Sequence, residues 1–432
     1  MLQPGYKETE VGVLPVEWEV KRLGELLSTK PSYGINAAAV PYSPELPTYL
    51  RITDISEDGT FVSEGRTSVA HSSAAQYFLN DDQIVVARTG ASTGKSYLYD
   101  RRDGKLVFAG FLIRVQPNPR RLLPTFLRAF IQTPAYWNWV ATASVRSGQP
   151  GINSDQLSRL VIPLPPLEEQ QAIAATLGAV DALLTEQRAL LAKKRDLKQA
   201  TQWALLTGKR RLPGFGGEWE ESTISQAFVF HSTGNFSRAE MTDSGEVACL
   251  HYGDIHTKYH GVIDCGTARL PFLRVAKPRN LVLLQDGDLV MADASEDYDG
   301  VGKSVEVRGV NGKQIVAGLH TILLRGNPKM IAPGFAALLP VMEKTRYDLL
   351  QIATGVSVYG ITKGNVAACR IDLPSLPEQH AIAQVLSDMD AELETLAQQV
   401  AKTEHLKAGL MHDLLTGRRR LTGGRGGGAD GL

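Results

Sequence analysis

A stretch of 48 residues occurs twice in this chain, and this repeat constrains the fold more than any other feature of the sequence. Residues 165–212 align without gaps with residues 374–421, at a constant offset of 209 positions, and 22 of the 48 aligned positions are identical. Copies of one motif fold as copies of one structural unit. We therefore expect two equivalent segments, each preceded by a longer stretch of different sequence.

Each copy of the repeat has the pattern of one long α-helix. In the second copy, eight of ten positions spaced alternately four and three residues apart from Ile382 to Leu414 are apolar, which is typical of a coiled-coil seam. The first copy has a weaker stripe, and a second line through Leu183, Leu190 and Leu197 is expected to widen it. Two core helices of a single bundle are the alternative. The seam residues expected on these partner-binding helices are Ile173, Leu177, Leu184 and Leu191 in the first copy, and Ile382, Leu386, Leu393 and Val400 in the second.

The two stretches that precede the repeats resemble each other more loosely. Each opens with a tryptophan between glutamates and has an extended segment that ends in Asp-Ile. Each continues with a strand after an acidic turn and with a Gly-Lys-Ser loop. In the first stretch these features are Glu17–Glu19, Leu50–Ile55, Asp81–Ala87 and Gly94–Ser96, and in the second they are Glu218–Glu220, Leu250–Ile255, Asp286–Ala292 and Gly302–Ser304. The pattern predicts two related domains that alternate with the two helices.

Length and composition fit a globular protein of more than one domain. The chain has 432 residues, of which 43% are hydrophobic and 21% are charged, and no apolar run is long enough to cross a membrane. The first residues lack the pattern of a signal peptide, and three cysteines provide no disulfide framework, so we expect a cytoplasmic protein. The formal net charge is zero, so any contact with nucleic acid depends on local basic patches or on partner subunits.

Motifs at the ends of the helices resemble those of a known family. The run at residues 163–170, the helix end at 205–212 and the segment 14–25 are similar to type I restriction enzyme specificity subunits, and the resemblance covers all but the Gly-rich tail. It implies that each of two target-recognition domains binds one half of a split DNA site, and that the paired helices set the spacing. It also implies methyltransferase and motor–nuclease (restriction) subunits as partners. The chain would then recognise DNA while its partners perform the chemistry.

From the repeat and the resemblance together, we predict an α+β fold. Two pseudo-symmetric α/β target-recognition domains alternate in it with two long helices that pair as an antiparallel coiled coil. Because the two domains differ in sequence, we expect the bipartite DNA site to be asymmetric. The predicted parts are a first recognition domain with the N-terminal segment (1–164), a first spacer helix (165–212), a second recognition domain (213–373), a second spacer helix (374–421) and a disordered Gly-rich tail (422–432).

Two local motifs allow other interpretations. A phosphate-binding P-loop has four residues between its glycines, whereas Gly90 and Gly94 enclose three; the loop can instead approach a DNA phosphate or form a plain turn. The Cys/His-rich segment from Cys249 to Cys265 lacks a paired C-x-x-C, so zinc is not expected. The sequence also lacks methyltransferase and helicase motifs. We therefore expect no catalytic centre, no cofactor and no metal.

Candidate DNA-contacting residues are polar and basic side chains of the Asp-Ile segments, the Gly-Lys-Ser loops and the polar loops before the last strand of each domain. They are Arg51, Arg88, Ser92, Lys95, Ser147 and Gln149 in the first domain, and His251, Lys258, Lys303, Ser357 and Tyr359 in the second. Two other functions remain open, namely a nucleotide-binding enzyme that uses the Gly-Lys-Ser loop and a coiled-coil scaffold without DNA specificity. A subunit of a methylation-only system would have the same sequence features.

Overall fold

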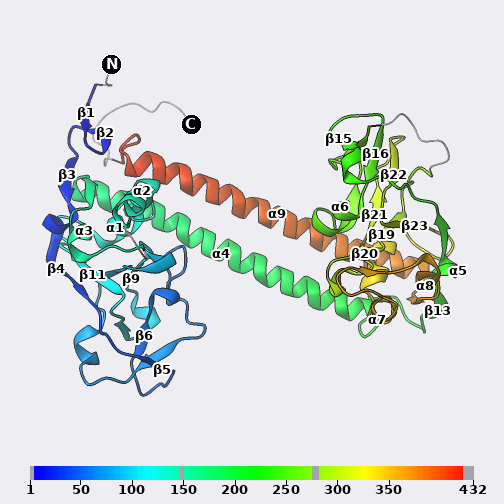
Figure 1. Ribbon diagram of the computed structural model, residues 1–432, viewed down its shortest axis with the longest axis horizontal. Helices are drawn as coiled ribbons and strands as arrows, with labels where there is room; N and C mark the ends of the chain where they lie inside the picture. The colour runs from blue at the N-terminus through cyan, green and yellow to red at the C-terminus, as the bar shows by residue number, and fades with distance from the viewer. Residues whose placement is uncertain (1–3, 146–149, 275–281, 422–432) are drawn as a thin grey trace. The chain divides into compact units, whose positions relative to one another are not determined.

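A computed structural model describes residues 4–145, 150–274 and 282–421 of the chain. The chain divides into unit 1, residues 1–188 and 398–432, and unit 2, residues 189–397. The long helices α4 (Leu167–Leu206) and α9 (Leu376–Leu415) each begin in one unit and end in the other. Each unit therefore combines half of each helix with one globular part (Figure 1). We call these parts head 1 (residues 4–166) and head 2 (residues 207–375).

Head 1 is built around two small sheets with the strand orders β4-β11-β8-β9 and β10-β6-β7-β5. Strand β11 is antiparallel to both of its neighbours, whereas β10 and β6 are parallel. The strands are β1 (Tyr6–Thr9), β2 (Gly12–Pro15), β3 (Glu19–Arg22), β4 (Leu27–Tyr33), β5 (Ala39–Pro41), β6 (Thr48–Leu50), β7 (Thr67–Val69), β8 (Ile84–Ala87), β9 (Ser96–Leu98), β10 (Leu106–Phe108), β11 (Leu112–Pro117) and β12 (Val161–Leu164). The helices are α1 (Pro124–Phe130), α2 (Pro134–Ala143) and α3 (Ser154–Ser158).

Successive side chains of strand β8 point to opposite sides of the sheet, and both sides are buried. Ile84 and Val86 belong to a core that also contains residues of α1, α2, α3, α4 and α9. Val85 and Ala87 belong to a second core with residues of β6 and β10. A continuous apolar strand of this kind needs cover on both sides, and head 1 provides helices on one side and the second sheet on the other.

Head 2 repeats this plan, with five strands instead of four in one of its sheets. Its sheets have the orders β14-β23-β19-β21-β17 and β15-β18-β16-β22. The strands are β13 (Glu220–Thr223), β14 (Phe228–His231), β15 (Met241–Thr242), β16 (Val247–Leu250), β17 (Gly261–Asp264), β18 (Phe272–Leu273), β19 (Asp288–Ala292), β20 (Ala294–Ser295), β21 (Ser304–Arg308), β22 (Gln314–Ala317), β23 (Thr321–Gly326), β24 (Tyr359–Gly360) and β25 (Arg370–Leu373). The helices are α5 (Ile224–Ala227), α6 (Tyr252–Thr257), α7 (Glu343–Gln351) and α8 (Lys363–Ala367), with a 3-10 helix at Ala336–Val341.

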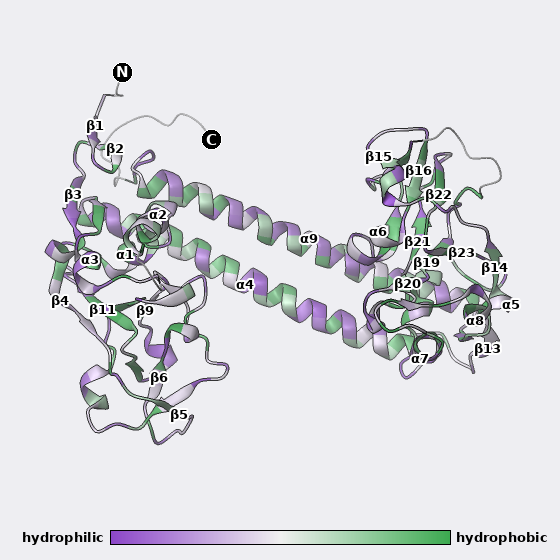
Figure 2. Ribbon diagram, in the orientation of Figure 1, coloured by the Kyte–Doolittle hydropathy of each residue, from purple (hydrophilic) through white to green (hydrophobic). Residues whose placement is uncertain are grey.

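Strand β19 is the buried centre of head 2, as β8 is in head 1. Leu289 and Met291 pack in a core that includes residues of α7, α8 and both long helices. Val290 and Ala292 pack on the opposite side with residues of β16, β21 and β22. Figure 2 shows hydrophobic residues gathered along the strands of this sheet.

The two long helices pair in antiparallel fashion within each unit. In unit 1, Lys407 lies 2.7 Å from Asp181 and Arg188 lies 2.7 Å from Glu404. In unit 2, Lys194 lies 2.6 Å from Glu392, and Lys198 forms an ion pair with Asp390. In both units the residue number falls along one helix as it rises along the other. These contacts confirm the predicted α+β fold with an antiparallel helix pair.

Burial distinguishes the predicted seam from the second line of leucines. Leu393 is half-buried, and the other predicted seam residues are buried, namely Ile173, Leu177, Leu184, Leu191, Ile382, Leu386 and Val400. In contrast, Leu183, Leu190 and Leu197 are exposed, so the expectation that they widen the seam is wrong. Two paired helices bury only one narrow stripe on each, and residues next to the stripe stay in solvent. Within the three described ranges, no helix is both long and apolar enough to span a membrane.

Candidate nucleic-acid interface

Two predicted recognition loops of head 1 are joined by backbone hydrogen bonds. Thr89 and Gly151 form an antiparallel bridge, and the N–H of Ile152 donates to the carbonyl of Arg88 at 2.9 Å. The N–H of Gly90 also donates to the carbonyl of Pro150 at 3.1 Å. The loop after β8 therefore lies beside the end of the polar loop that precedes α3. The candidates Ser147 and Gln149 in that polar loop lie outside the described residues.

Head 2 joins the equivalent loops in the same way. Strand β20 pairs with β24, so that Ala294 lies opposite Gly360. The N–H of Ile361 donates to the carbonyl of Asp293 at 2.9 Å, as Ile152 does to Arg88 in head 1. We call each of these paired segments the joined loops: residues 88–96 with 150–153 in head 1, and residues 293–304 with 354–361 in head 2.

Backbone hydrogen bonds also give the register between the two heads. The N–H of Ala87 donates to the carbonyl of Lys95 at 2.7 Å, and Ala292 donates to Lys303 at 2.8 Å. One residue further on, Arg88 donates to the carbonyl of Phe111 at 3.0 Å, and Asp293 donates to that of His320 at 3.1 Å. Arg88 therefore corresponds to Asp293, and Phe111 corresponds to His320. The signal for this was in the sequence, because these residues directly follow the matched strands that end at Ala87 and Ala292.

Arg88 is stacked on an aromatic ring and keeps one donor without a partner. Its guanidinium carbon lies 4.5 Å from the centre of the Tyr33 ring. The Tyr33 hydroxyl is held by α3, at 3.2 Å from the Ser154 hydroxyl and 3.1 Å from the Ser154 N–H. The Arg88 Nε is buried and has no hydrogen-bond partner in the described part of the chain. The position of this cation is thus fixed by packing rather than by a carboxylate.

The Gly-Lys-Ser loops are packed against helices of their own heads. The Tyr136 hydroxyl on α2 donates to the carbonyl of Gly94 at 2.8 Å. The N–H groups of Gly94 and Lys95 donate within the loop, to Ala87 and Ser92. The N–H groups of Gly94 and Lys95 are therefore occupied and are not available to a phosphate. Ser92 is half-buried in the same loop.

The two lysines of these loops differ in their partners. Lys95 Nζ lies 2.7 Å from a carboxylate oxygen of Glu57, and only 19% of its side chain is exposed. Lys303 is half-buried and has no ion-pair partner among residues 4–145, 150–274 and 282–421. In head 2, the Tyr359 ring packs edge-on against Tyr298 at 5.3 Å, whereas Ser357 is exposed. Lys303, Ser357 and Tyr359 thus remain near the surface of the joined loops.

The Asp-Ile segments are internal turns. Arg51 binds buried Asp54 with two hydrogen bonds of 2.9 and 2.7 Å, which raise the pKa of Arg51. In head 2, Lys258 lies 3.2 Å from Asp254, which is fully buried. These two candidate cations are therefore partly neutralised by carboxylates of their own head.

His251 is buried rather than presented to a ligand. Its side chain is 6% exposed, and its Nδ1 accepts a hydrogen bond from the N–H of Gly253 at 3.1 Å. Burial, followed by the nearby Arg238 cation, lowers the pKa of His251 and keeps the ring neutral. The equivalence with Arg51 therefore reflects a shared helix start and not a shared donor. Burial also raises the pKa of Cys249 to about 12 and that of Cys265 to about 11, and within the described ranges no His/Cys/Asp/Glu group is placed to hold a metal ion.

The repeated motif joins each head to the helices. In unit 1, buried Glu169 binds Arg420 with hydrogen bonds of 2.7 and 2.9 Å and accepts one from the Trp18 indole at 2.9 Å. In unit 2, buried Glu378 binds Arg211 in the same bidentate manner, which raises the pKa of Arg211. Each pair links the start of one helix to the segment after the end of the other. The identities of the repeat therefore have a structural reason.

The glutamine after each of these glutamates makes three hydrogen bonds. Gln170 Oε1 accepts from the N–H of Leu123 at 2.9 Å, and its Nε2 donates to the carbonyls of Arg121 and Pro165 at 2.9 Å each. Gln379 Oε1 accepts from Ala332 at 2.9 Å, and its Nε2 donates to Met330 and Pro374 at 2.8 and 2.9 Å. The two heads are thus attached to their helices by the same contacts.

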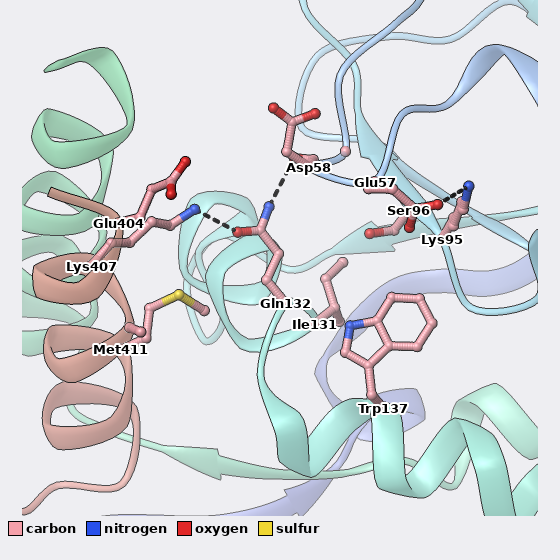
Figure 3. Close-up of a pocket in the computed structure, with 12 residues that line it drawn as sticks. Glu57, Asp58, Lys95, Ser96, Ile131, Gln132, Trp137, Glu404, Lys407 and Met411 are labelled. Atoms are coloured by element: carbon pink, nitrogen blue, oxygen red, sulfur yellow. Dashed lines mark hydrogen bonds and ion pairs between the residues drawn. The ribbon is translucent and has the colours of Figure 1, made fainter. Parts of the chain in front are cut away.

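Each unit has a groove between its head and one long helix. In unit 1 it encloses about 320 Å³ beside α9 and is lined by charged and polar side chains that include Glu57, Lys95, Gln132, Glu404 and Lys407 (Figure 3). Lys407 donates to Gln132 at 3.4 Å, and Gln132 donates to the carbonyl of Asp58 at 3.1 Å. In unit 2 it encloses about 710 Å³ beside α4 and is lined by residues that include Arg195, Trp203, Arg346, Tyr347 and Leu350. Ile131, Trp137 and Met411 add apolar surface to the first groove, so both grooves combine apolar and charged side chains.

Comparison with known proteins first gives the class. Residues 15–193 match the family described as the type I restriction modification DNA specificity domain. This part comprises head 1 from residue 15 onward and the first portion of α4. The matched class is thus a DNA specificity module of restriction–modification enzymes.

Whole-chain relatives give the particular kind of protein. The putative type I restriction enzyme MjaX specificity subunit of Methanocaldococcus jannaschii is 25% identical, with 97% of both chains covered. The StySPI specificity subunit of Salmonella potsdam is 21% identical over 74% of this chain and 70% of that protein. These relatives confirm the resemblance to type I specificity subunits that the repeated motifs predict.

Solved structures share the fold. The S subunit of a type I restriction–modification system from M. genitalium has a TM-score of 0.57 at 15% identity, with 96% of this chain and 99% of that chain covered. A chain from a study of complex assembly and conformational transition of a type I system has a TM-score of 0.50 at 16% identity, with 94% and 99% covered. The α+β fold with two long helices is therefore that of specificity subunits.

Proposed function

We propose that this chain recognises a bipartite, asymmetric DNA site as the specificity subunit of a type I restriction–modification complex. The observation that carries the proposal is the shared frame of the joined loops. Both heads hold these loops with the same backbone hydrogen bonds, yet Arg88 in head 1 corresponds to Asp293 in head 2. Loops on a rigid scaffold are suited to recognition, and two unlike loops of this kind favour two unlike half-sites.

The candidate contacts in this proposal are of unequal strength. Arg88, Lys303, Ser357 and Tyr359 lie on the joined loops with surface available. Arg51, Lys95 and Lys258 have carboxylate partners in their own heads, and His251 is buried. We expect DNA contacts from the first group to contribute more to base discrimination than those from the second.

We further propose that the helices hold two methyltransferase subunits, which in turn recruit restriction subunits, and that these partners perform the catalysis. The seam residues such as Leu184 and Val400 are buried between helices of this chain, so a partner would meet the other faces. Leu183, Leu190 and Leu197 of α4 are exposed apolar side chains of the kind that protein interfaces cover. Three free, buried cysteines agree with the cytoplasmic location we propose.

We propose residues 1–164 and 213–373 as the exchangeable recognition domains, with residues 165–212 and 374–421 as the constant spacers. The test is to express the chain with its cognate methyltransferase subunit in a host without adenine methylation and to sequence the methylated sites. A split, asymmetric motif is expected. Replacement of residues 16–164 by the corresponding domain of a relative should change one half of the motif and leave the other half intact.

The same preparation separates the alternatives. A nucleotide-dependent enzyme would bind nucleotide and lose that affinity in a Lys95→Ala variant. A scaffold without DNA specificity would bind the partner subunit but leave methylation independent of the exchanged domain. An uninterrupted methylated motif would contradict the proposed function.

A further inference from the structure

The residue directly after the buried strand of each head is charged, and the charge is opposite in the two heads: Arg88 follows β8, and Asp293 follows β19. The backbone of Arg88 and that of Asp293 make the same two links, to Phe111 and Ile152 in head 1 and to His320 and Ile361 in head 2. The strands before them, β8 and β19, are fully buried. The main chain is therefore held in one place in both heads while the side chain changes from a cation to an anion. A change of this kind alters ligand preference without altering the fold.

In head 1 the arrangement suits a planar ligand with two acceptors. The Arg88 guanidinium is stacked on Tyr33, and Ser154 holds the Tyr33 hydroxyl from α3. Stacking fixes the plane of the Arg88 guanidinium before a ligand binds, so that the side chain loses less conformational entropy on binding. The Nε lacks a hydrogen-bond partner among the described residues, so no carboxylate in that part of the chain engages it. In DNA, the O6 and N7 atoms of guanine offer such a pair of acceptors.

In head 2 the arrangement suits a ligand that donates. The carboxylate of Asp293 is 30% exposed, and one of its oxygens lies 3.2 Å from His320 Nδ1. His320 itself adopts a left-handed backbone conformation with φ of 55°, which is strained for a residue other than glycine and is common at functional sites. A carboxylate is repelled by DNA phosphates, so it can approach a groove favourably only where it accepts a hydrogen bond. The amino groups of cytosine and adenine are donors of this kind.

The side chains beside these two half-buried positions are exposed. Phe111 is 57% exposed although it is a large apolar residue, and His320 is 49% exposed at the corresponding place. In head 2, Val356 and Val358 of the joined loops are also exposed. Exposed apolar side chains such as Phe111, Val356 and Val358 are frequent on binding surfaces.

We propose that Arg88 and Asp293 are specificity-determining residues that read bases from equivalent positions of the two heads. Arg88 reads a guanine in the half-site of head 1, and Asp293 reads an exocyclic amino group, of cytosine or adenine, in the half-site of head 2. This inference rests on the proposed function, because it assigns the bases within the bipartite site.

The test compares Arg88→Ala, Arg88→Lys and Asp293→Asn variants, each expressed with the cognate methyltransferase subunit, by sequencing methylated sites. Loss of a bidentate contact should lower the preference for guanine at one position of the first half-site by about 10- to 100-fold. Arg88→Lys should relax the same position, because lysine keeps the charge but not the planar fork. Asp293→Asn should relax one position of the second half-site. The half-sites are assigned beforehand by the exchange of residues 16–164.

Matched controls test whether charge or position matters. Arg66 is also stacked on a tyrosine, at 3.9 Å from the Tyr42 ring centre, but lies outside the joined loops. Asp243 is an exposed carboxylate of head 2 outside those loops. Arg66→Ala and Asp243→Asn should leave the motif unchanged. In each variant the unaffected half-site reports that the protein is folded.

The outcomes separate the inference from the proposed function. A motif unchanged in both Arg88→Ala and Asp293→Asn would overturn the inference while the bipartite site stands. An Arg88→Lys variant that keeps full discrimination would also overturn it, because the contact would then be one of charge alone. If the wild-type protein gives no split motif, the proposed function itself fails.

Discussion

The two heads agree where they join the long helices and differ where their loops meet. At the junctions, Glu169 with Arg420 and Glu378 with Arg211 are the same buried pair in two copies. At the joined loops, an arginine in one head corresponds to an aspartate in the other. The grooves also differ in position, since one lies beside α9 and the other beside α4. The two heads thus share their attachment and the backbone frame of their joined loops, and they differ in the side chains that these loops carry.

The largest expected effect lies in a small asymmetry between the junctions. The Trp18 indole donates to Glu169, whereas the Trp219 indole nitrogen is buried without a partner in the described part of the chain. When Arg420 is removed, the buried carboxylate of Glu169 keeps the hydrogen bond from Trp18. When Arg211 is removed, the buried carboxylate of Glu378 has no equivalent hydrogen bond from Trp219. We expect Arg211→Ala to destabilise unit 2 by about 4 kcal/mol and Arg420→Ala to destabilise unit 1 by less.

Hydrogen exchange of peptides from each unit measures this difference. A Lys209→Ala variant is the control, because Lys209 stacks on Trp203 near the junction without binding Glu378. Equal losses of protection in Arg211→Ala and Arg420→Ala would show that the tryptophans do not distinguish the two junctions.

The glycines of the Gly-Lys-Ser loops should give the next largest effect. Gly94 has φ of 92°, and a Cβ there would meet Val140 at 2.9 Å; Gly302 has φ of 71°, and its Cβ would meet Leu349 at 3.1 Å. We expect Gly94→Ala to destabilise by about 3 kcal/mol and Gly302→Ala by about 2 kcal/mol. Gly409→Ala, in open space on α9, should be neutral or slightly stabilising. Denaturant unfolding gives the three values, and a harmless Gly94→Ala would contradict the packing role of this loop.

A smaller effect is expected when the exposed leucines are changed. Leu190 and Leu197 on α4 and Leu406 on α9 are all exposed, but α4 has a line of such residues and α9 does not continue it. If α4 docks a methyltransferase subunit, Leu190→Glu should weaken the complex about tenfold, while Leu406→Glu should weaken it less. Affinity measured by titration of the purified subunits checks this, and an equal loss would assign the partner to both helices alike.

The smallest effect concerns the lysines of the equivalent loops. Lys95 is already paired with Glu57, whereas Lys303 lacks a carboxylate partner in the described ranges. The salt dependence of DNA binding is the slope of the logarithm of the binding constant against the logarithm of the salt concentration. We expect Lys303→Ala to reduce the magnitude of this slope by about one, and Lys95→Ala to change it less. Binding isotherms at several salt concentrations measure both slopes. A larger change in Lys95→Ala would mean that its ion pair opens when DNA binds.

Much of the fold could be predicted from the sequence, because it depends on repeated, periodic features. The alternating spacing of apolar residues from Ile382 onward identified α9, and its paired copy identified α4. The same reasoning was wrong for Leu183, because spacing alone does not say how wide a seam two helices bury. The hydrophobicity of a side chain indicates that its burial would be favourable, but only the packing of the folded chain shows whether it is buried.

Less of the candidate interface could be predicted, because it depends on contacts between distant residues. His251 looked like a surface donor opposite Arg51, but its burial and its bond to Gly253 follow from how α6 begins. The correspondence of Arg88 with Asp293 required the backbone register across Phe111 and His320. Matching similar residues between the two halves of the sequence could not find this pair, because arginine and aspartate are chemically unlike.

One of the contacts that attach each head, the buried glutamine at the start of the helix, has a consequence for how such proteins can change. An amide side chain offers one acceptor and two donors, and Gln170 and Gln379 use all three on main-chain atoms. Every residue type except proline supplies the same N–H and carbonyl, so this socket is indifferent to the side chains of the head that it holds. A foreign head with the same loop path could therefore keep these three hydrogen bonds whatever its residues at those positions, and only its apolar residues that pack against the helix, at Ile173 and Leu177 for example, would have to match.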